Sequence, residues 1–133
     1  LHITLREKKY DVAKKLIELG ANINLPFNGT TPIHVALDNN ESEIAKFLIK
    51  NGADTSYIAR DCGKNALQKA AFSGELGVLK LLIDAGADVN KVDNSGFTPL
   101  ISAIISNNKP EILQLLLDAG ADVNFKAENA GPD

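Results

Sequence analysis

The sequence is poor in aromatic residues and contains neither methionine nor tryptophan. Because aromatics make up only 5% of its 133 residues, a folded core must be built from leucine, isoleucine, valine and alanine. The single cysteine, Cys62, excludes an internal disulfide and favours a reducing compartment, so we expect an intracellular, cytoplasmic protein. The apolar runs fall far short of the ~20 residues of a transmembrane helix, and we therefore expect no membrane insertion.

A large excess of one charge is also missing. The formal net charge of −3 argues against nucleic acid or an anionic membrane as the main partner. No secretory signal is visible at the N-terminal end. The chain opens on Leu1 without a methionine, from which we expect that the natural protein extends beyond this segment.

The residues that carry chemistry are scattered along the chain. Asp54, Asp88 and Asp122 recur at equivalent places in a repeated phrase, which predicts a row of carboxylates and not a convergent acid/base pair. Cys62 has no histidine nearby in sequence, and there is no glycine-rich phosphate loop or serine elbow. The sequence therefore predicts no catalysis, no metal site and no cofactor.

What the chain has in abundance is internal repetition. The stretch LLIDAGADVN at 81–90 returns as LLLDAGADVN at 115–124, starting 34 residues later. Each such phrase has aliphatic residues at helical spacing and ends in a glycine, which suits the left-handed position that closes a helix. The glycine of the phrase recurs at spacings of 32, 34 and 34 residues, as Gly20, Gly52, Gly86 and Gly120.

A second phrase lies between these helix ends. It reads GTTPIHVAL at 29–37, GKNALQKAA at 63–71 and GFTPLISAI at 96–104. Threonine before proline predicts a helix start, since the hydroxyl caps free backbone donors and proline tolerates the first helical position. Asn65 keeps a capping residue in the middle copy, and Pro110 is expected in the first turn of the last helix.

The period of about 33 residues, the phrase TPIHVA at 31–36 and the GADVN endings together resemble the ankyrin repeat, whose signature is Thr-Pro-Leu-His-x-Ala. The resemblance implies an all-α solenoid of stacked helix–turn–helix units joined by β-turn or hairpin loops. We expect one array over 1–133, with repeats at about 1–24, 25–56, 57–90 and 91–124, and with 125–133 starting a further repeat or a C-terminal tail.

The repeated letters are expected to build the core and the links between units. His2 and His34 match the signature histidine, which the resemblance implies ties neighbouring turns by hydrogen bonds. Gln68 keeps this capacity in the third unit, whereas Ile101 loses it in the fourth. Substitution of one interlayer leucine by alanine is expected to cost roughly 2–5 kcal/mol. The leucines expected between layers are Leu48, Leu67, Leu82, Leu100 and Leu116.

Ankyrin repeats usually bind partners through their turn tips and the exposed side of their inner helices, which is where this sequence stops repeating. Equivalent inner-helix positions run Arg6, Asp38, Phe72 and Ile105, so the row changes from charged to apolar. If Phe72, Phe97 and Ile105 are exposed, they form an apolar centre with a polar rim, the usual anatomy of a protein-binding surface. The alternative is that they fold inward. The candidate partner-binding residues are Phe27, Asp38, Asp61, Lys64, Phe72, Ser73, Asn94, Phe97, Ile105 and Ser106.

The sequence thus predicts a monomeric protein-interaction module that binds another protein through a concave face, without catalysis. One alternative is that the array is the targeting or regulatory segment of a larger enzyme, channel or effector protein. Another is a purely structural spacer.

Overall fold

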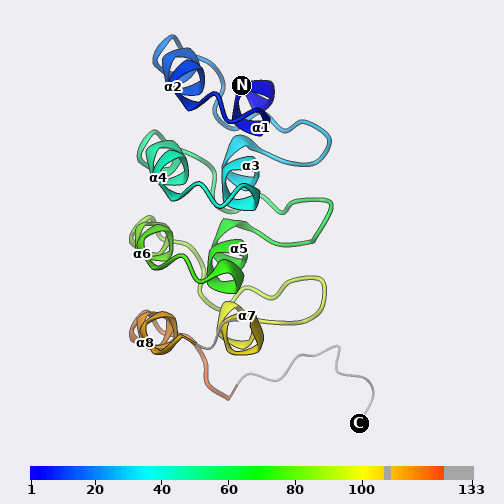
Figure 1. The fold of residues 1–133 in the computed structure, drawn as a ribbon. Helices are drawn as coiled ribbons and strands as arrows, with labels where there is room; N and C mark the ends of the chain where they lie inside the picture. Colours follow the sequence, from blue (N-terminus) through cyan, green and yellow to red (C-terminus); the bar gives the residue numbers. More distant parts are fainter. Residues whose placement is uncertain (107–108, 125–133) are drawn as a thin grey trace.

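The computed structural model describes residues 1–106 and 109–124, which form eight short helices and no strand. Figure 1 shows the helices stacked in two columns, with the long loops projecting from one side of the stack. The inner column contains α1 (His2–Arg6), α3 (Pro32–Asp38), α5 (Ala66–Ser73) and α7 (Pro99–Ser106). The outer column contains α2 (Tyr10–Glu18), α4 (Ser42–Lys50), α6 (Leu76–Asp84) and α8 (Pro110–Asp118). The predicted all-α solenoid is confirmed.

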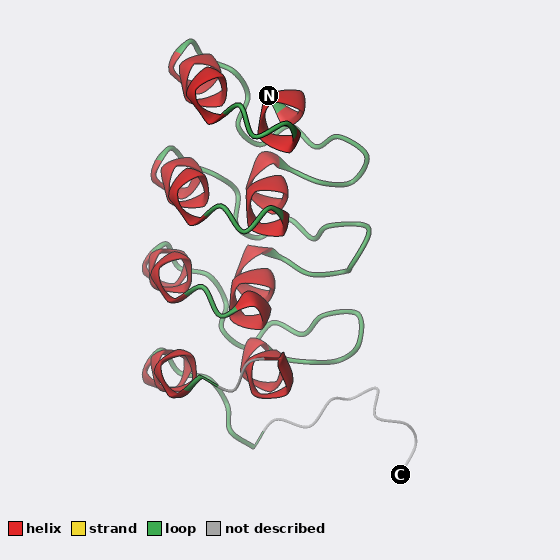
Figure 2. Cartoon of the chain, viewed as in Figure 1, coloured by secondary structure: helices red, strands yellow, loops and turns green. Residues whose placement is uncertain are grey.

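The loops carry almost no regular structure, as the colouring of Figure 2 makes clear. One isolated β-bridge joins Phe27 to Thr30 in the first long loop. The tips of the next two loops are closed by backbone hydrogen bonds, from Ala59 N to Lys64 O at 2.9 Å and from Asp93 N to Phe97 O at 2.9 Å. The loops are therefore turns at their tips and not extended hairpins.

Helix starts follow the sequence prediction at two of the three inner helices that have a capping residue. Asn65 and Gln68 form a reciprocal capping box, with Gln68 N donating to Asn65 Oδ1 at 3.0 Å and Asn65 N to Gln68 Oε1 at 2.7 Å. Thr98 Oγ1 accepts from Ile101 N at 3.3 Å. The prediction is wrong at Thr31, whose hydroxyl lies 2.8 Å from Nδ1 of His34 and caps no backbone N–H. The imidazole competes for this hydroxyl because it sits in the first turn of the same helix.

The outer helices end as predicted. Gly20, Gly52, Gly86 and Gly120 have φ angles between 90° and 101°, the left-handed conformation that a side chain disfavours. The backbone thus reverses at the same point in each unit.

The core between the layers is the predicted one. The exposed fraction of its leucine side chains is at most 7%, and that of Ala36, Ala70 and Ala103 is zero. These small alanines let the inner helices pack closely, as α5 does against α3 and α7. The predicted interlayer leucines are all buried: Leu48, Leu67, Leu82, Leu100 and Leu116.

Polar links run to the next loop from the inner helices α1, α3 and α5. His2 Nε2 lies 2.9 Å from Thr30 O, and His34 Nε2 lies 3.2 Å from Lys64 O, so the structural role expected of both histidines is confirmed. Gln68 Nε2 donates to Lys91 O at 2.7 Å, as its amide allows. The segment 125–133, expected to start a further repeat or a C-terminal tail, lies outside the described residues. The predicted unit boundaries stay predictions.

Candidate partner-binding surface

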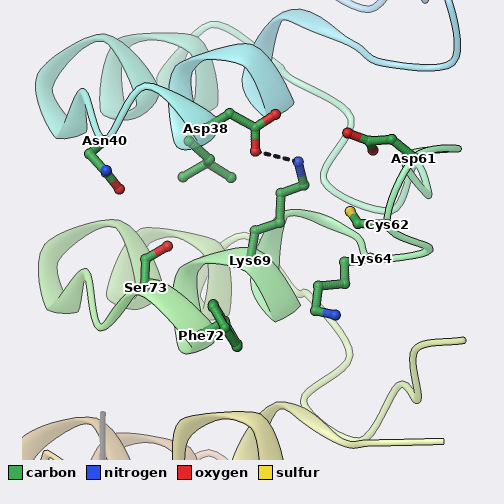
Figure 3. A pocket seen from close by; sticks show the side chains of 9 residues that line it. Asp38, Asn40, Asp61, Cys62, Lys64, Lys69, Phe72 and Ser73 are labelled. Atoms are coloured by element: carbon green, nitrogen blue, oxygen red, sulfur yellow. Dashed lines mark hydrogen bonds and ion pairs between the residues drawn. The ribbon is translucent and has the colours of Figure 1, made fainter. Parts of the chain in front are cut away.

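A pocket of about 330 Å³ opens between α3, α5 and the tip of the loop that precedes α5. Figure 3 shows Lys69 reaching from α5 to Asp38, with Asp61 and Cys62 on the loop tip to one side and Ser73 on the other. The structure brings together half of the predicted partner-binding residues in this pocket: Asp38, Asp61, Lys64, Phe72 and Ser73.

Lys69 is the lining residue that sequence reasoning missed. Its side chain is 8% exposed, and its Nζ donates to Asp38 Oδ1 at 2.6 Å. The equivalent positions in the neighbouring units hold the buried Val35 and Ser102. The sequence could have indicated this ion pair, because the other units hold a small or apolar residue at this position. A lysine placed there needs a nearby carboxylate for its ammonium. Asp38, half exposed, supplies it.

Lys64 links this pocket to the following loop. Its Nζ lies 3.1 Å from Oδ2 of Asp93, a carboxylate whose side chain is fully buried. Asp93 Oδ1 accepts from Ser95 N at 2.8 Å and from Phe97 N at 3.0 Å. Burial alone would raise the pKa of Asp93, but these N–H groups and the Lys64 ammonium outweigh it, and the pKa is lowered. Lys64 therefore has a structural role besides lining the pocket.

The Lys64 ammonium also lies 5.9 Å from the centre of the Phe72 ring, within the range of a cation–π contact. Both pocket lysines are thus engaged, Lys64 with Asp93 and Lys69 with Asp38. Asp61 is the lining charge that makes no ion pair with the described residues. The pocket is accordingly lined by both an aromatic ring and a carboxylate that has no ion pair among the described residues.

The predicted apolar residues are exposed and do not fold inward. The exposed fraction is 51% for Phe72, 62% for Ile105 and 37% for Phe97. Phe72 lines the pocket, whereas Phe97 and Ile105 lie outside it, on the next loop and on α7. The row of Arg6, Asp38, Phe72 and Ile105 is exposed along its whole length. The structure thus decides between the two alternatives in favour of exposure, and partner binding stays a prediction.

The remaining candidates do not converge on the pocket. Asn94 packs against Gly63, where an added Cβ would collide with its amide. The Ser106 hydroxyl lies 2.7 Å from both Phe72 O and Ser102 O, which ties α7 to α5. Phe27 is 56% exposed, and its ring lies 5.7 Å from that of His2, at the other end of the stack. Asn94 and Ser106 thus contact neighbouring units of the stack, and Phe27 lies far from the pocket along the stack.

The two side chains with potential reactivity, Cys62 and His34, lie in different surroundings. The pocket contains the Cys62 thiol but no histidine that could act as its base. His34 is fully buried between Thr31 Oγ1 and Lys64 O. Burial, together with the nearby Lys69 charge, lowers the pKa of this imidazole. Among the described residues no three histidine, cysteine or acidic side chains are placed to hold a metal ion. None of the described helices has the length and apolarity needed to cross a membrane.

Comparison with known proteins gives one family. A family model described as ankyrin repeats (3 copies) matches residues 1–59 and 55–127. Over 63 residues the chain is 40% identical to neurogenic locus notch homolog protein 1 of Xenopus tropicalis, covering 47% of this chain and 2% of that protein. It is 40% identical over 68 residues to the putative E3 ubiquitin-protein ligase XBAT34 of Arabidopsis thaliana, covering 49% and 18%.

A third relative is the putative ankyrin repeat protein FPV219 of Fowlpox virus (strain NVSL), 39% identical over 59 residues. The match covers 44% of this chain and 14% of the viral protein. The matched part is thus a small fraction of each of these relatives, between 2% and 18% of their lengths.

Proposed function

This chain belongs to the ankyrin repeat family, and on that premise we propose that it binds a protein partner through the face formed by its loop tips and inner helices. Ankyrin repeats are in general protein–protein interaction modules. The single observation that carries the proposal is the exposure of Phe72 and Ile105 in a row whose residues differ from unit to unit. Packing does not require these side chains at the surface, and water disfavours them there.

The partner would contact a mixed surface. Phe72 and Ile105 supply apolar area, and the Asp61 carboxylate and Ser73 hydroxyl at the pocket supply polar contacts. A stable interface of about 800 Å² per partner is within reach of three or four repeats. We propose a monomeric array that acts inside the cell by reversible binding, without chemistry of its own.

Affinity capture from native lysate tests the proposal. The wild-type array is compared with the triple variant Phe72→Ala/Phe97→Ala/Ile105→Ala by quantitative mass spectrometry. We expect the triple variant to lose the proteins that the wild type enriches. The matched control is Val12→Ala/Leu19→Ala/Leu117→Ala, which removes apolar side chains with exposed fractions of 49%, 73% and 39%.

The control triple variant is expected to keep the captured proteins, with thermal melts confirming that both variants fold. If both triple variants lost the captured proteins equally, nonspecific hydrophobic adsorption, and not binding to this face, would account for the capture. If the wild type enriches nothing above bead background, the structural spacer is the better reading.

A second candidate is that the array serves as the targeting or regulatory segment of a longer enzyme, channel or effector. The observation that favours it is that each of the three relatives is much longer than its matched part. Determining the transcript that encodes this segment tests it directly. A catalytic or membrane domain in the same reading frame would support this candidate, and its absence would reject it.

A further inference from the structure

Asparagine side chains bridge two of the three pairs of neighbouring turns that the structure describes. Asn24 Oδ1 accepts from Asp54 N at 2.6 Å, and its Nδ2 donates to Gly52 O at 3.2 Å. Asn90 repeats the arrangement, accepting from Asp122 N at 2.9 Å and donating to Gly120 O at 3.2 Å. One carboxamide thus satisfies a backbone donor and a backbone acceptor of the following turn at two separate places.

The unit between them lacks this bridge. The phrases GANIN, GADTS and GADVN place Ser56 where the other two have asparagine. The Ser56 hydroxyl donates to Asp54 Oδ1 at 2.6 Å, inside its own turn. Among the residues that the structure describes, none donates to the Gly86 carbonyl, and none accepts from the Asp88 N–H. The equivalents of these two groups are both paired at Gly52–Asp54 and at Gly120–Asp122.

A pocket of about 370 Å³ lies at this position, lined by Ser56, Ile58, Gly86, Ala87 and Asp88 among others. It shares no lining residue with the pocket between α3 and α5. Ile58, 39% exposed, offers apolar surface at its wall. The missing carboxamide therefore leaves both a space and the two backbone groups that would hold one.

We propose that this pocket is a binding slot for the carboxamide side chain of a glutamine or asparagine supplied by a partner protein. The amide oxygen accepts from Asp88 N–H and the amide nitrogen donates to Gly86 O, while the methylene groups lie against Ile58 and Ala87. A carboxylate lacks the donor that Gly86 O needs. The Asp88 carboxylate repels it, whereas the Lys91 ammonium, which also lines the pocket, attracts it, so selection rests on the Gly86 carbonyl. An ammonium lacks the acceptor that Asp88 N–H needs. The slot goes beyond the proposed binding face, because none of its lining residues is among the candidate partner-binding residues.

Nuclear magnetic resonance titration of the isotopically labelled chain tests the slot. The probe is the capped peptide acetyl-Ala-Gln-Ala-methylamide, which carries one primary amide, compared with the same peptide containing Glu or Lys. We expect a saturable shift of the Asp88 amide resonance at millimolar peptide. The Glu and Lys peptides are expected to bind roughly tenfold more weakly, since each leaves one polar group without a partner.

Two variants test whether the peptide binds at this slot. In Ser56→Asn the chain fills its own slot, so the Gln peptide is expected to leave the Asp88 resonance unmoved. In Asn90→Ser a second slot opens, and the peptide is expected to shift the Asp122 resonance, which does not respond in the wild type. The proposal is overturned if Asp88 does not respond to the Gln peptide, if the Glu peptide shifts it equally, or if the response survives in the folded Ser56→Asn variant. The first result would mean that water alone occupies the slot, the second that the slot does not select a carboxamide, and the third that the peptide binds elsewhere.

Discussion

The junction between the α3–α4 layer and the α5–α6 layer (the middle junction) differs from the one between α5–α6 and α7–α8 (the lower junction). Both bury the same kind of leucine core. At the middle junction, however, each side-chain hydrogen bond between the layers involves an ionisable group. His34 bonds to Lys64 O, Lys69 donates to Asp38, and the Ser42 hydroxyl donates to the Glu75 carboxylate at 2.6 Å.

The lower junction includes links that do not titrate. Gln68 replaces the histidine and donates to Lys91 O, and Asn90 bridges to Gly120 and Asp122. It also contains the Lys64–Asp93 ion pair, whose carboxyl titrates only in acid because its pKa is lowered. The two junctions are therefore held by different kinds of polar link, and the stability of each junction should depend differently on pH.

The largest effect is expected where the two junctions are alike. Leu48→Ala and Leu82→Ala each remove a fully buried side chain, and each should lower the free energy of unfolding by roughly 2–5 kcal/mol. Urea unfolding followed by circular dichroism measures both losses. Leu117→Ala, at a side chain that is 39% exposed, is the control and should cost about 0.5 kcal/mol or less. A negligible loss at either buried leucine would mean that the junctions do not share a core.

The next largest effect is expected at the middle junction alone, at the Asp38–Lys69 ion pair. Asp38→Ala leaves the Lys69 ammonium, 8% exposed, without its carboxylate. Because Asp38 itself is half exposed, we expect a loss on the order of 2 kcal/mol, between the values for surface and buried pairs. The double variant Asp38→Ala/Lys69→Met removes the stranded charge and should be more stable than Asp38→Ala alone. Equal unfolding energies for the single and double variants would contradict a buried, pair-dependent lysine.

The pH dependence near neutrality should come from the middle junction. Burial lowers the pKa of His34 in the folded state below its unfolded value of about 6.5, so the unfolded chain binds the proton more readily. The free energy of unfolding should therefore fall as pH drops below about 6.5, until the folded-state pKa is passed. Thermal melts between pH 5 and pH 8 measure this. The Lys69 charge strengthens the effect, and the Lys64 carbonyl and the Asp38 and Asp61 carboxylates oppose it.

His34→Gln places at the middle junction the residue that Gln68 provides at the lower one. This variant should lose the fall in stability below pH 6.5, whereas His2→Gln keeps the buried imidazole and should retain it. An unchanged pH profile in His34→Gln would assign the dependence to another group.

Much of the fold was predictable because it follows from local patterns. Helical spacing located Leu48 and Leu82 in the core, and the glycine phrase located the helix ends. Alignment of the units placed Phe72 and Ile105 in one row but left their exposure open, and the structure shows that both are exposed. Such features depend on neighbours a few residues away or exactly one unit apart, and both relations are visible in a repeat sequence.

The details that escaped prediction depend on which partner a side chain meets, either across layers or within one helical turn. Lys64 was expected on a polar rim, yet Asp93 of the next loop holds it. Lys69 was overlooked because its partner Asp38 lies 31 residues earlier. Thr31 fits a capping pattern, but the His34 ring lies within reach of its hydroxyl. A local pattern does not say which of two nearby acceptors or donors a side chain will choose.

The smallest effect is a gain, and it would make the middle junction resemble the lower one. Ser56→Asn supplies the carboxamide that Asn90 provides one unit later, and it should add hydrogen bonds to Gly86 O and Asp88 N–H. Because these groups are exposed, we expect about 1 kcal/mol of added stability, or a melting temperature about 4 °C higher. Asn90→Ser should lose a similar amount.

Ser56→Asp is the matched control, since aspartate has the shape of asparagine but no donor for the Gly86 carbonyl. It also brings a second carboxylate close to Asp88, and it should therefore give no gain in the same melts. If Ser56→Asp stabilised the chain as much as Ser56→Asn, the gain would come from the turn preference shared by the two residues. A gain confined to asparagine would instead show that the bridge, present at the lower junction and missing at the middle one, is what separates them.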